Sequence, residues 1–379
     1  MTDGDVQETL TGTRPLELSR NPTLVVKIGS SSLVGSDGSV DPEAVSRVCR
    51  QVVTARNAGA RVVLVSSGAI AAGMPELGFD QRPADVEALQ AVAAVGQVRL
   101  MIEYRAAFAH AGVHMGQVLL TRFDFEERGQ YLHARSTLRH LLEIGVVPVV
   151  NENDTVADDE IRFGDNDRLS ALVAHLIAAD ALVLLTDQPG LLSSDPRLSE
   201  EATLIEEVHA IDHELDAAAG AGGPLGSGGM ASKLAAARMA SWSGVATLIA
   251  DATREDVLST LMEGHSVGTV VRPHDRRLSS RKLWIAFAQA AAGRVFVDEG
   301  AARALERDGS SLLAVGVVAV SGAFRSGDAV EVCGREGTLI AKGLARVDSK
   351  ELSEILGRRD APVVCHRDDL VVLSGGPGL

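Results

Sequence analysis

The sequence has few aromatic residues, few cysteines and no long uninterrupted apolar run. Only 3% of its 379 residues are aromatic although 46% are hydrophobic, so the core must be built from Ala, Val, Leu and Ile. Side chains of this kind suit buried parallel strands flanked by helices. An odd number of cysteines without a C-x-x-C pair indicates neither a disulfide framework nor a zinc site. The three thiols, Cys49, Cys333 and Cys365, are therefore expected to be reduced and structural.

The sequence also lacks an apolar N-terminal segment and an excess of positive charge. Residues 1–18 are polar and acidic, so no signal peptide is expected. The longest apolar stretch, Ala171–Thr186, contains His175 and Asp180 and is too short and too polar to span a bilayer. The formal net charge of −15 argues against broad nucleic-acid binding, which requires clustered cations. We therefore expect a cytoplasmic protein without a membrane partner, in which a few lysines can still attract an anionic substrate.

Most of the chain alternates short apolar runs with helix-length amphipathic segments. The expected strands are Leu24–Ile28, Val62–Ser66, Val118–Thr121, Val146–Val150, Leu182–Thr186 and Thr247–Ala250. The expected helices are Pro42–Ala58, Pro83–Ala111, Gln130–Glu143 and Arg168–Ala178. This alternation predicts right-handed crossovers and a mostly parallel sheet covered by helices on both faces. We expect a flexible arm over residues 1–20, followed by a three-layer α/β domain (αβα) over residues 21–271.

A change of composition marks the end of this domain. Residues 272–292 hold a short basic stretch and are expected to form a linker. Residues 293–379 consist of short β-rich segments separated by glycines, a pattern that is typical of a small β-barrel. Acidic residues outnumber basic ones in this last segment, so its charge predicts no basic face.

Polar and glycine-rich segments follow the C-terminal ends of several expected strands. These segments are Lys27–Ser31, Ser66–Gly73, Asn151–Asp154, Gly164–Asp167 and Thr186–Asp187. Open α/β sheets bind ligands at this edge, where free backbone N–H groups suit phosphate and carboxylate oxygens. Each segment also has a plain structural interpretation: a surface lysine beside a turn, a helix cap at Ser67, or a solvated acidic loop.

A glycine-rich loop over residues 216–229 precedes Lys233, which falls in the first turn of an expected helix. The loop is not a Walker A loop, because Leu234 follows the lysine where Ser or Thr is required. A G-x-G-x-x-A match that begins at Gly226 is also weak, since no strand precedes it. The spacing therefore matches neither of these phosphate-binding patterns well.

Together these segments resemble the amino acid kinase family, and within it the glutamate 5-kinases, from about Thr23 to the C-terminus. The specific stretches are Val25–Gly29, Ser67–Gly73, Ala94–Gln97, Asn151–Asp154, Gly164–Asp167 and Leu185–Gln188. Residues 293–379 resemble the PUA domain of many bacterial members, and the likeness is carried by Gly309–Leu313, Gly327–Val330 and His366–Asp369. Serine stands at positions 227 and 232, where the family usually has threonine. The hydroxyl groups are retained, so we expect nucleotide binding to be retained too.

The resemblance implies that ATP phosphorylates the γ-carboxylate of L-glutamate to give L-glutamyl 5-phosphate, the first step of proline biosynthesis, with Mg²⁺ as cofactor. It implies catalytic roles for Lys27, Asp165 and Lys233. Glutamate would be bound by Ser67, by Asp154, which would accept from its α-ammonium group, and by Asn166, which would donate to a carboxylate. Nucleotide would be bound by Lys27, Thr186, Asp187, Ser227, Gly228, Gly229, Met230, Ala231, Ser232 and Lys233. No residue is assigned as a metal ligand.

The chemistry of this reaction explains why lysines matter more than a general base. A glutamate side chain has a pKa of about 4.3 and is already ionised at neutral pH. Positive charge is needed, because an anion attacks an anionic phosphoryl group. We hypothesise that Lys27 stabilises the transferring phosphoryl group and Lys233 the leaving side. Asp165 would orient both lysines, and Asp167 would be a supporting acid.

The resemblance further implies feedback inhibition by proline, a homodimer or homotetramer, and transfer of the product to γ-glutamyl phosphate reductase. One alternative is a kinase of the same fold that acts on aspartate, N-acetylglutamate or a nucleoside monophosphate. Another is a regulator that binds RNA through residues 293–379. The complete set of Lys27, Asp165 and Lys233 favours an active kinase, with a structural or regulatory role for the second domain.

Overall fold

The computed structural model describes residues 16–35, 38–156, 166–194, 202–209, 211, 229–265, 267–274, 277–289, 291–358 and 360–373. These residues divide into two compact units. The first takes in most of the chain up to Pro273, and the second comprises the chain from His274 onward together with residues 122–131 and 242–244. Among the described helices, none combines the length and apolar character that crossing a membrane requires.

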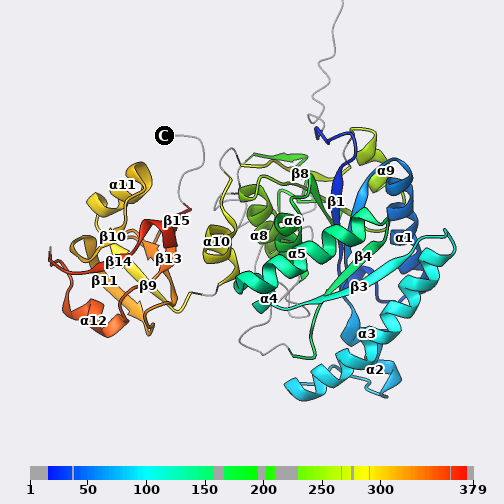
Figure 1. The fold of residues 1–379 in the computed structure, drawn as a ribbon, viewed down its shortest axis with the longest axis horizontal. Helices are drawn as coiled ribbons and strands as arrows, with labels where there is room; N and C mark the ends of the chain where they lie inside the picture. Colours follow the sequence, from blue (N-terminus) through cyan, green and yellow to red (C-terminus); the bar gives the residue numbers. More distant parts are fainter. Residues whose placement is uncertain are drawn as a thin grey trace, which may run out of the picture. The chain divides into compact units, whose positions relative to one another are not determined.

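The first unit is built on an eight-stranded sheet with the strand order β3-β4-β2-β1-β5-β7-β8-β6 (Figure 1). Its strands are β1 (Thr23–Ile28), β2 (Arg61–Val65), β3 (Met115–Leu120), β4 (Val147–Glu152), β5 (Ala181–Thr186), β6 (Glu207–Val208), β7 (Ala246–Asp251) and β8 (Thr269–Val271). The pairs from β3 through to β7 are all parallel, and β8 runs antiparallel to β7. The prediction of a mostly parallel sheet is therefore confirmed.

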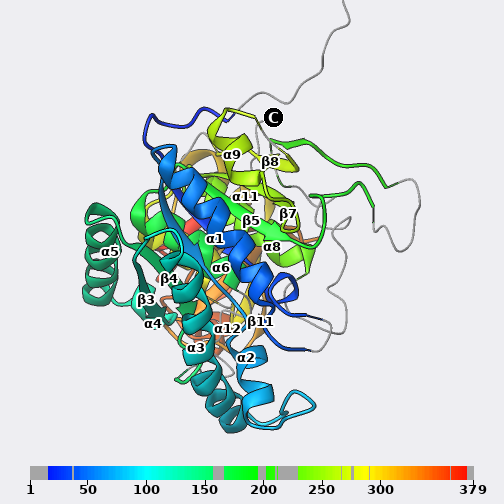
Figure 2. The same cartoon turned by 90° about the vertical axis from the view of Figure 1, so that its right-hand side faces the viewer.

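Helices cover both faces of this sheet, as the alternation predicted. They are α1 (Pro42–Asn57), α2 (Ala69–Glu76), α3 (Val86–Ala109), α5 (Arg128–Glu143), α6 (Asn166–Ile177), α8 (Met230–Trp242) and α9 (Val257–Met262). Figure 1 shows α1 and α3 on one side of β1 and α6 and α8 on the other, and Figure 2 shows α1 lying across the sheet. The sequence starts α1 and α3 with capping aspartates: Asp41 accepts from the Glu43 N–H, and Asp85 accepts from the Ala88 N–H.

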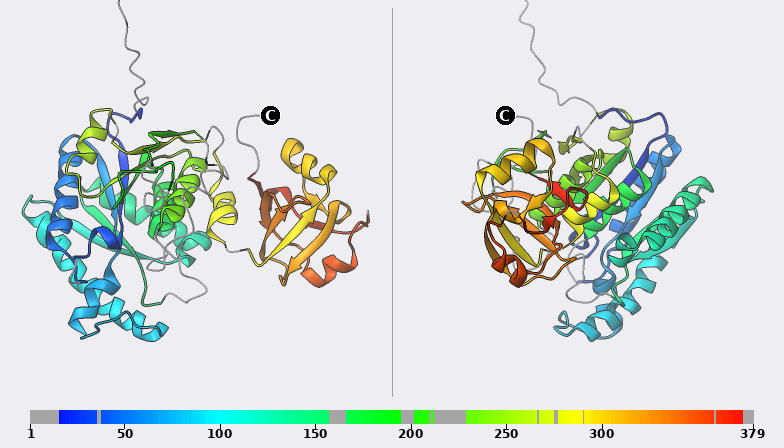
Figure 3. Two further views of the ribbon diagram at one scale, coloured as in Figure 1. Left: turned by 180° about the vertical axis from the view of Figure 1, so that it is seen from behind. Right: turned by 60° about the vertical axis from the view of Figure 1, so that its left-hand side comes forward.

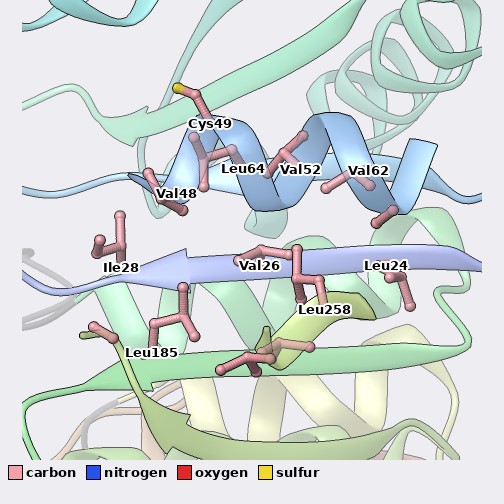
Figure 4. Close-up of a cluster of buried hydrophobic side chains, with 14 of the residues drawn as sticks. Leu24, Val26, Ile28, Val48, Cys49, Val52, Val62, Leu64, Leu185 and Leu258 are labelled. Carbon is pink, nitrogen blue, oxygen red and sulfur yellow. The ribbon is translucent and has the colours of Figure 1, made fainter. Parts of the chain in front are cut away.

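The core between the sheet and α1 consists of small and branched apolar side chains. Alternate residues of β1, namely Leu24, Val26 and Ile28, pack in one buried cluster with Val48 and Val52 of α1 (Figure 4). Successive side chains of a strand point to opposite faces, so Lys27 points to the face that α6 and α8 cover. The backbone of β1 thus decides where this lysine is presented.

Two of the helices approach each other unusually closely. A Cβ atom added at Gly96 of α3 would lie 1.8 Å from the carbonyl oxygen of Ala69 in α2, and one added at Gly73 would lie 2.0 Å from the carbonyl oxygen of Val92. Only glycine fits at both positions, and α3 is consequently held against the segment that follows β2.

The second unit has its own sheet, which Figure 3 shows from two further sides. It also has its own cluster of buried apolar side chains. Its strands are β9 (Gly293–Val297), β10 (Leu312–Leu313), β11 (Val317–Gly322), β12 (Ala329–Cys333), β13 (Leu339–Leu344), β14 (Val363–Cys365) and β15 (Leu370–Val372). Five of them form a sheet in the order β11-β9-β12-β13-β15, and β10 pairs with β14. Its helices are α4 (Phe123–Glu126), α10 (Ser280–Leu283), α11 (Glu299–Asp308) and α12 (Ser349–Glu354), with a π-helix, η2 (Trp284–Ala288). The predicted small β domain at the C-terminus is confirmed.

Part of the segment 272–292, which we expected to be a linker, forms helical structure in the second unit. Ile285 and Ala286 of η2 are buried in a cluster with Val371 of β15. Lys342, a buried residue of β13, donates from Nζ to the carbonyl oxygens of Ala286, at 3.2 Å, and of Gln289. These contacts attach the end of the π-helix to the sheet.

All three cysteines are free and buried, in agreement with the interpretation as structural thiols. Burial raises the pKa of Cys49 well above its usual value and that of Cys365 to about 12. Neither thiol therefore supplies a thiolate at neutral pH.

Candidate functional site

The predicted polar segments meet at one edge of the sheet. Strands β4, β2, β1 and β5 are consecutive parallel neighbours, so their C-terminal ends lie side by side. Lys27 pairs in register with Val65 on β2 and with Leu184 on β5. Helices α6 and α8 begin at the same edge, because Asp167 of α6 contacts both Lys27 of β1 and Lys233 of α8.

Asp167 joins two buried lysines. Lys27 Nζ lies 2.5 Å from Asp167 Oδ1, and Lys233 Nζ lies 3.3 Å from Asp167 Oδ2. The carboxylate is fully buried, and the Lys27 and Lys233 side chains are only 2% and 7% exposed. Burial strengthens such interactions because the local dielectric constant is low. One carboxylate therefore fixes the positions of two ammonium groups that come from opposite ends of the domain's sequence.

The glycine-rich loop contributes a third contact to the same carboxylate. Ser232 Oγ donates to Asp167 Oδ2 at 3.2 Å, and Ser232 is one of the two serines that replace the family's threonine. Gly229, Met230 and Ala231 lie next to it, at the start of α8. A hydroxyl at position 232 is thus used within the protein to hold Asp167.

Three of the predicted site residues, Asp165, Ser227 and Gly228, lie outside the described residues. The role that we expected for Asp165, orienting the two lysines, stays a prediction. The described residue that contacts both lysines is Asp167, for which the sequence predicted only a supporting role.

Asn166 is the centre of a buried amide network beside the lysines. Its Nδ2 lies 2.5 Å from the Ser66 carbonyl oxygen, 3.0 Å from Ser67 Oγ and 2.8 Å from Asn151 Oδ1. Asn151 in turn donates from Nδ2 to Gln97 Oε1 at 2.8 Å. The network joins the ends of β2 and β4, the start of α6 and the middle of α3.

Two backbone groups determine the orientation of the side-chain amides of Asn151 and Asn166. The Glu152 N–H donates to Asn151 Oδ1 at 2.9 Å, so the oxygen of Asn151 must face that way. The Ser66 carbonyl can only accept, so Asn166 must present its nitrogen there. With Nδ2 of Asn166 engaged inside the protein, Oδ1 is the atom that remains for a ligand. Ser67 Oγ accepts from Asn166, which leaves its O–H to donate elsewhere.

The remaining predicted residues follow strands β4 and β5. Asp154 is half-buried in the turn two residues beyond β4. Thr186 is buried at the end of β5, and its Oγ1 donates to Asp187 Oδ1 at 3.1 Å. The structure places both segments at the sheet edge where the lysines lie.

Sequence reasoning assigned no individual role to the residues behind the network. Gln97, Tyr104, Ser66 and Asn151 are all buried, and Ser66 Oγ lies 2.8 Å from Tyr104 Oη. Burial, with smaller effects from neighbouring groups, raises the pKa of Tyr104 well above its usual value, so its hydroxyl stays neutral. Gln97 stood in a stretch that the family resemblance singled out, but no role could be predicted for it. Its position beside Gly96, in the close contact between α2 and α3, is the feature that brings it to the site.

The described part of the site is compatible with magnesium as part of a nucleotide complex. Among the described residues, no group of three or more histidine, cysteine, aspartate or glutamate side chains is placed to hold a metal. Asp167 is occupied by Lys27, Lys233 and Ser232. Mg²⁺ commonly keeps several waters and binds through substrate phosphates and one or two carboxylates. The site is therefore compatible with a magnesium ion that arrives with ATP.

Comparison with known proteins shows which families the two parts of the chain match. The model for the amino acid kinase family matches residues 22–251, and the model for the PUA domain matches residues 293–364. A glutamate 5-kinase of Pelobacter propionicus is 45% identical over 362 residues, which cover 92% of this chain and 97% of that protein. A glutamate 5-kinase of Herminiimonas arsenicoxydans is 47% identical with the same coverage. A solved structure of UMP kinase from Bacillus anthracis covers 66% of this chain and 96% of its own at 15% identity, with a TM-score of 0.47.

Proposed function

The chain belongs to the amino acid kinase family, and we propose that it transfers the γ-phosphoryl group of ATP to the γ-carboxylate of L-glutamate. The product is L-glutamyl 5-phosphate, which makes the protein a glutamate 5-kinase of proline biosynthesis. The observation that carries this proposal is the buried Lys27–Asp167–Lys233 arrangement at the strand ends. The names of the relatives, at 45% and 47% identity over nearly the whole chain, support the choice of acceptor.

The lysines supply what this reaction needs. A carboxylate nucleophile must approach a phosphoryl group that is also negatively charged, so positive charge has to be in place beforehand. Lys27, on the central strand, acts on the transferring phosphoryl group, and Lys233, at the start of α8, acts on the leaving side. Asp167 holds both ammonium groups in fixed positions, so little reorganisation is required during the transfer.

The amide network supplies the acceptor subsite. Ser67 donates its hydroxyl to a carboxylate of glutamate, and Asn166 Oδ1 accepts from the α-ammonium group. This assignment revises the role expected for Asn166, because its Nδ2 is already engaged by Ser66, Ser67 and Asn151. Asp154, beyond β4, provides a carboxylate for the same ammonium group.

The nucleotide subsite is formed by the residues after β5 and by the start of α8. Thr186 and Asp187 contact the nucleoside part, and residues 227–233 surround the phosphates. A magnesium ion bound with ATP would supply neutralisation of phosphate charge. The chain's own contribution is to place Lys27 and Lys233, and Asp165 is the further carboxylate that we propose near them.

Other parts of the proposal rest on family resemblance. Proline is the expected feedback inhibitor, a homodimer or homotetramer the expected assembly, and γ-glutamyl phosphate reductase the expected recipient of the product. The matches to residues 22–251 and 293–364 support a kinase domain over 21–271 and a PUA domain over 293–379, separated by residues 272–292 and preceded by an arm over 1–20. Because its substrates are cytoplasmic metabolites, the enzyme is proposed to be cytoplasmic.

The test is ADP release by the purified protein with ATP, Mg²⁺ and one of four acceptors: L-glutamate, L-aspartate, N-acetyl-L-glutamate or UMP. We expect ADP release that depends on L-glutamate. None of the other three acceptors is expected to support ADP release with comparable efficiency. Turnover of a different acceptor alone would keep the kinase chemistry and overturn the choice of glutamate. An absence of ADP release with all four acceptors would overturn the proposed function.

A further inference from the structure

Helix α3 presents two polar side chains to the back of the site. Gln97 and Tyr104 are seven residues apart, so they lie on the same face of the helix. Gln97 is 8% exposed and Tyr104 is fully buried. Gln97 Oε1 accepts from Asn151 Nδ2, and Tyr104 Oη lies 2.8 Å from Ser66 Oγ. Each thus contacts a residue that itself contacts Asn166, and neither has a role in the reaction described above.

We propose that Gln97 is a positioning residue for glutamate binding, acting through Asn151 on Asn166. This inference rests on the proposed function, because it assigns Asn166 to the glutamate subsite. Gln97 holds the amide of Asn151, and Asn151 Oδ1 then holds the amide of Asn166 at 2.8 Å. The orientation of Asn166 decides whether the subsite presents an acceptor or a donor to the substrate's α-ammonium group.

The direction of this relay follows from hydrogen-bond chemistry. The Glu152 N–H binds Asn151 Oδ1, so Asn151 Nδ2 must face α3 and needs an acceptor there. Gln97 Oε1 provides it at 2.8 Å. Without that acceptor the buried amide N–H is left unsatisfied, a penalty of roughly 1–3 kcal/mol that favours another orientation of Asn151. A reoriented Asn151 would turn a donor toward Asn166 Nδ2, and the two nitrogens would repel.

A second observation separates Gln97 from an ordinary buried glutamine. Within the described part of the chain, Gln97 Nε2 is buried and has no hydrogen-bond partner. An apolar side chain of similar size would fill the same space without this unsatisfied donor. Gln51 of α1 is the contrasting case: its Nε2 donates to the Arg254 carbonyl at 2.8 Å, and its Oε1 accepts from the Leu258 N–H at 3.3 Å. Gln51 joins two elements of the fold, whereas only the oxygen of Gln97 is used.

The experiment compares Gln97→Met with Gln51→Met in the full-length protein. Both variants remove a buried glutamine amide, and both are expected to lower the temperature of thermal unfolding. Only Gln97→Met is expected to raise the KM for glutamate, by about five- to tenfold, on the scale of one lost buried hydrogen bond. Its KM for ATP and its kcat should stay within about twofold of the wild type. Gln97→Leu replaces Gln97→Met if the methionine variant does not fold.

A double-mutant cycle with Asn151→Ala tests whether Gln97 acts through Asn151. Once Asn151 is truncated, Gln97→Met should raise the glutamate KM no further, because the relay is already broken. Additive effects would show that Gln97 acts independently of Asn151 and would overturn the proposal. An unchanged glutamate KM in Gln97→Met, or equal rises for glutamate and ATP, would overturn it as well. A wild-type protein that does not turn over glutamate would instead overturn the proposed function on which it rests.

Discussion

At the scale of single residues, the site depends on one carboxylate with three partners. Asp167 contacts Lys27, Lys233 and Ser232 and is fully buried. The sequence identified both lysines and the segment that holds the aspartate. It gave Asp167 only a supporting role, because the contacts of a single acidic side chain are not a local signal. The course of α6 brings Asp167 to both lysines.

Replacing Asp167 with asparagine should reduce turnover strongly. The variant keeps the shape of the side chain but removes the charge that holds the two lysines, so we expect kcat to fall by about 10² or more, on the scale of losing one preorganised electrostatic contact. Asp180→Asn is the matched control, because Asp180 caps the other end of β1 by accepting from the Thr23 N–H. Steady-state kinetics on both variants should show the loss of kcat only for Asp167→Asn. A kcat near that of the wild type would refute the role given to Asp167.

At the scale of elements, the site depends on how closely α3 approaches α2. The sequence predicted a helix over 83–111, and α3 spans Val86–Ala109. It also predicted the strands whose ends carry the polar residues, because buried apolar runs and their boundaries are local signals. It did not predict the contact through Gly73 and Gly96, which depends on the packing of two helices and leaves no periodic pattern in the sequence. For the same reason, Gln97 received no role.

Gly96→Ala should damage both stability and glutamate binding. The new methyl group would lie 1.8 Å from the Ala69 carbonyl oxygen and 2.3 Å from the Gly73 amide nitrogen, so the helices must separate. We expect a loss of about 2–3 kcal/mol in the free energy of unfolding, at the upper end for overpacked interiors. The glutamate KM should rise as Gln97 moves away from Asn151.

Gly129→Ala is the control for this prediction. Gly129 lies in α5, and a Cβ atom there would meet nothing within 4 Å. The added methyl group should leave urea unfolding unchanged or make the protein more stable by up to about 1 kcal/mol, since alanine favours helix. If Gly96→Ala and Gly129→Ala had the same free energy of unfolding and the same glutamate KM, the importance of the contact between α2 and α3 would be contradicted.

At the scale of the whole molecule, the described residues that we assign to catalysis and substrate binding all belong to the first unit. The second unit has a separate core. The division into a parallel α/β domain and a small β domain was visible in the sequence, because the periodicity of apolar residues changes between them. The order of the strands was not visible, since β4 and β5 flank the pair β2–β1 only through long-range pairing.

The central claim is that a phosphoryl group moves from ATP to the γ-carboxylate of glutamate. The most direct measurement uses L-glutamate labelled with ¹⁸O in both γ-carboxylate oxygens, with hydroxylamine present to trap the acyl phosphate as a hydroxamate. Hydroxylamine attacks the acyl carbon, so the displaced phosphate keeps the oxygen that joined it to glutamate. One ¹⁸O atom per phosphate is predicted, in step with hydroxamate formation and ADP release. Phosphate released without ¹⁸O would show that the γ-phosphoryl group of ATP is transferred to water and would contradict the account.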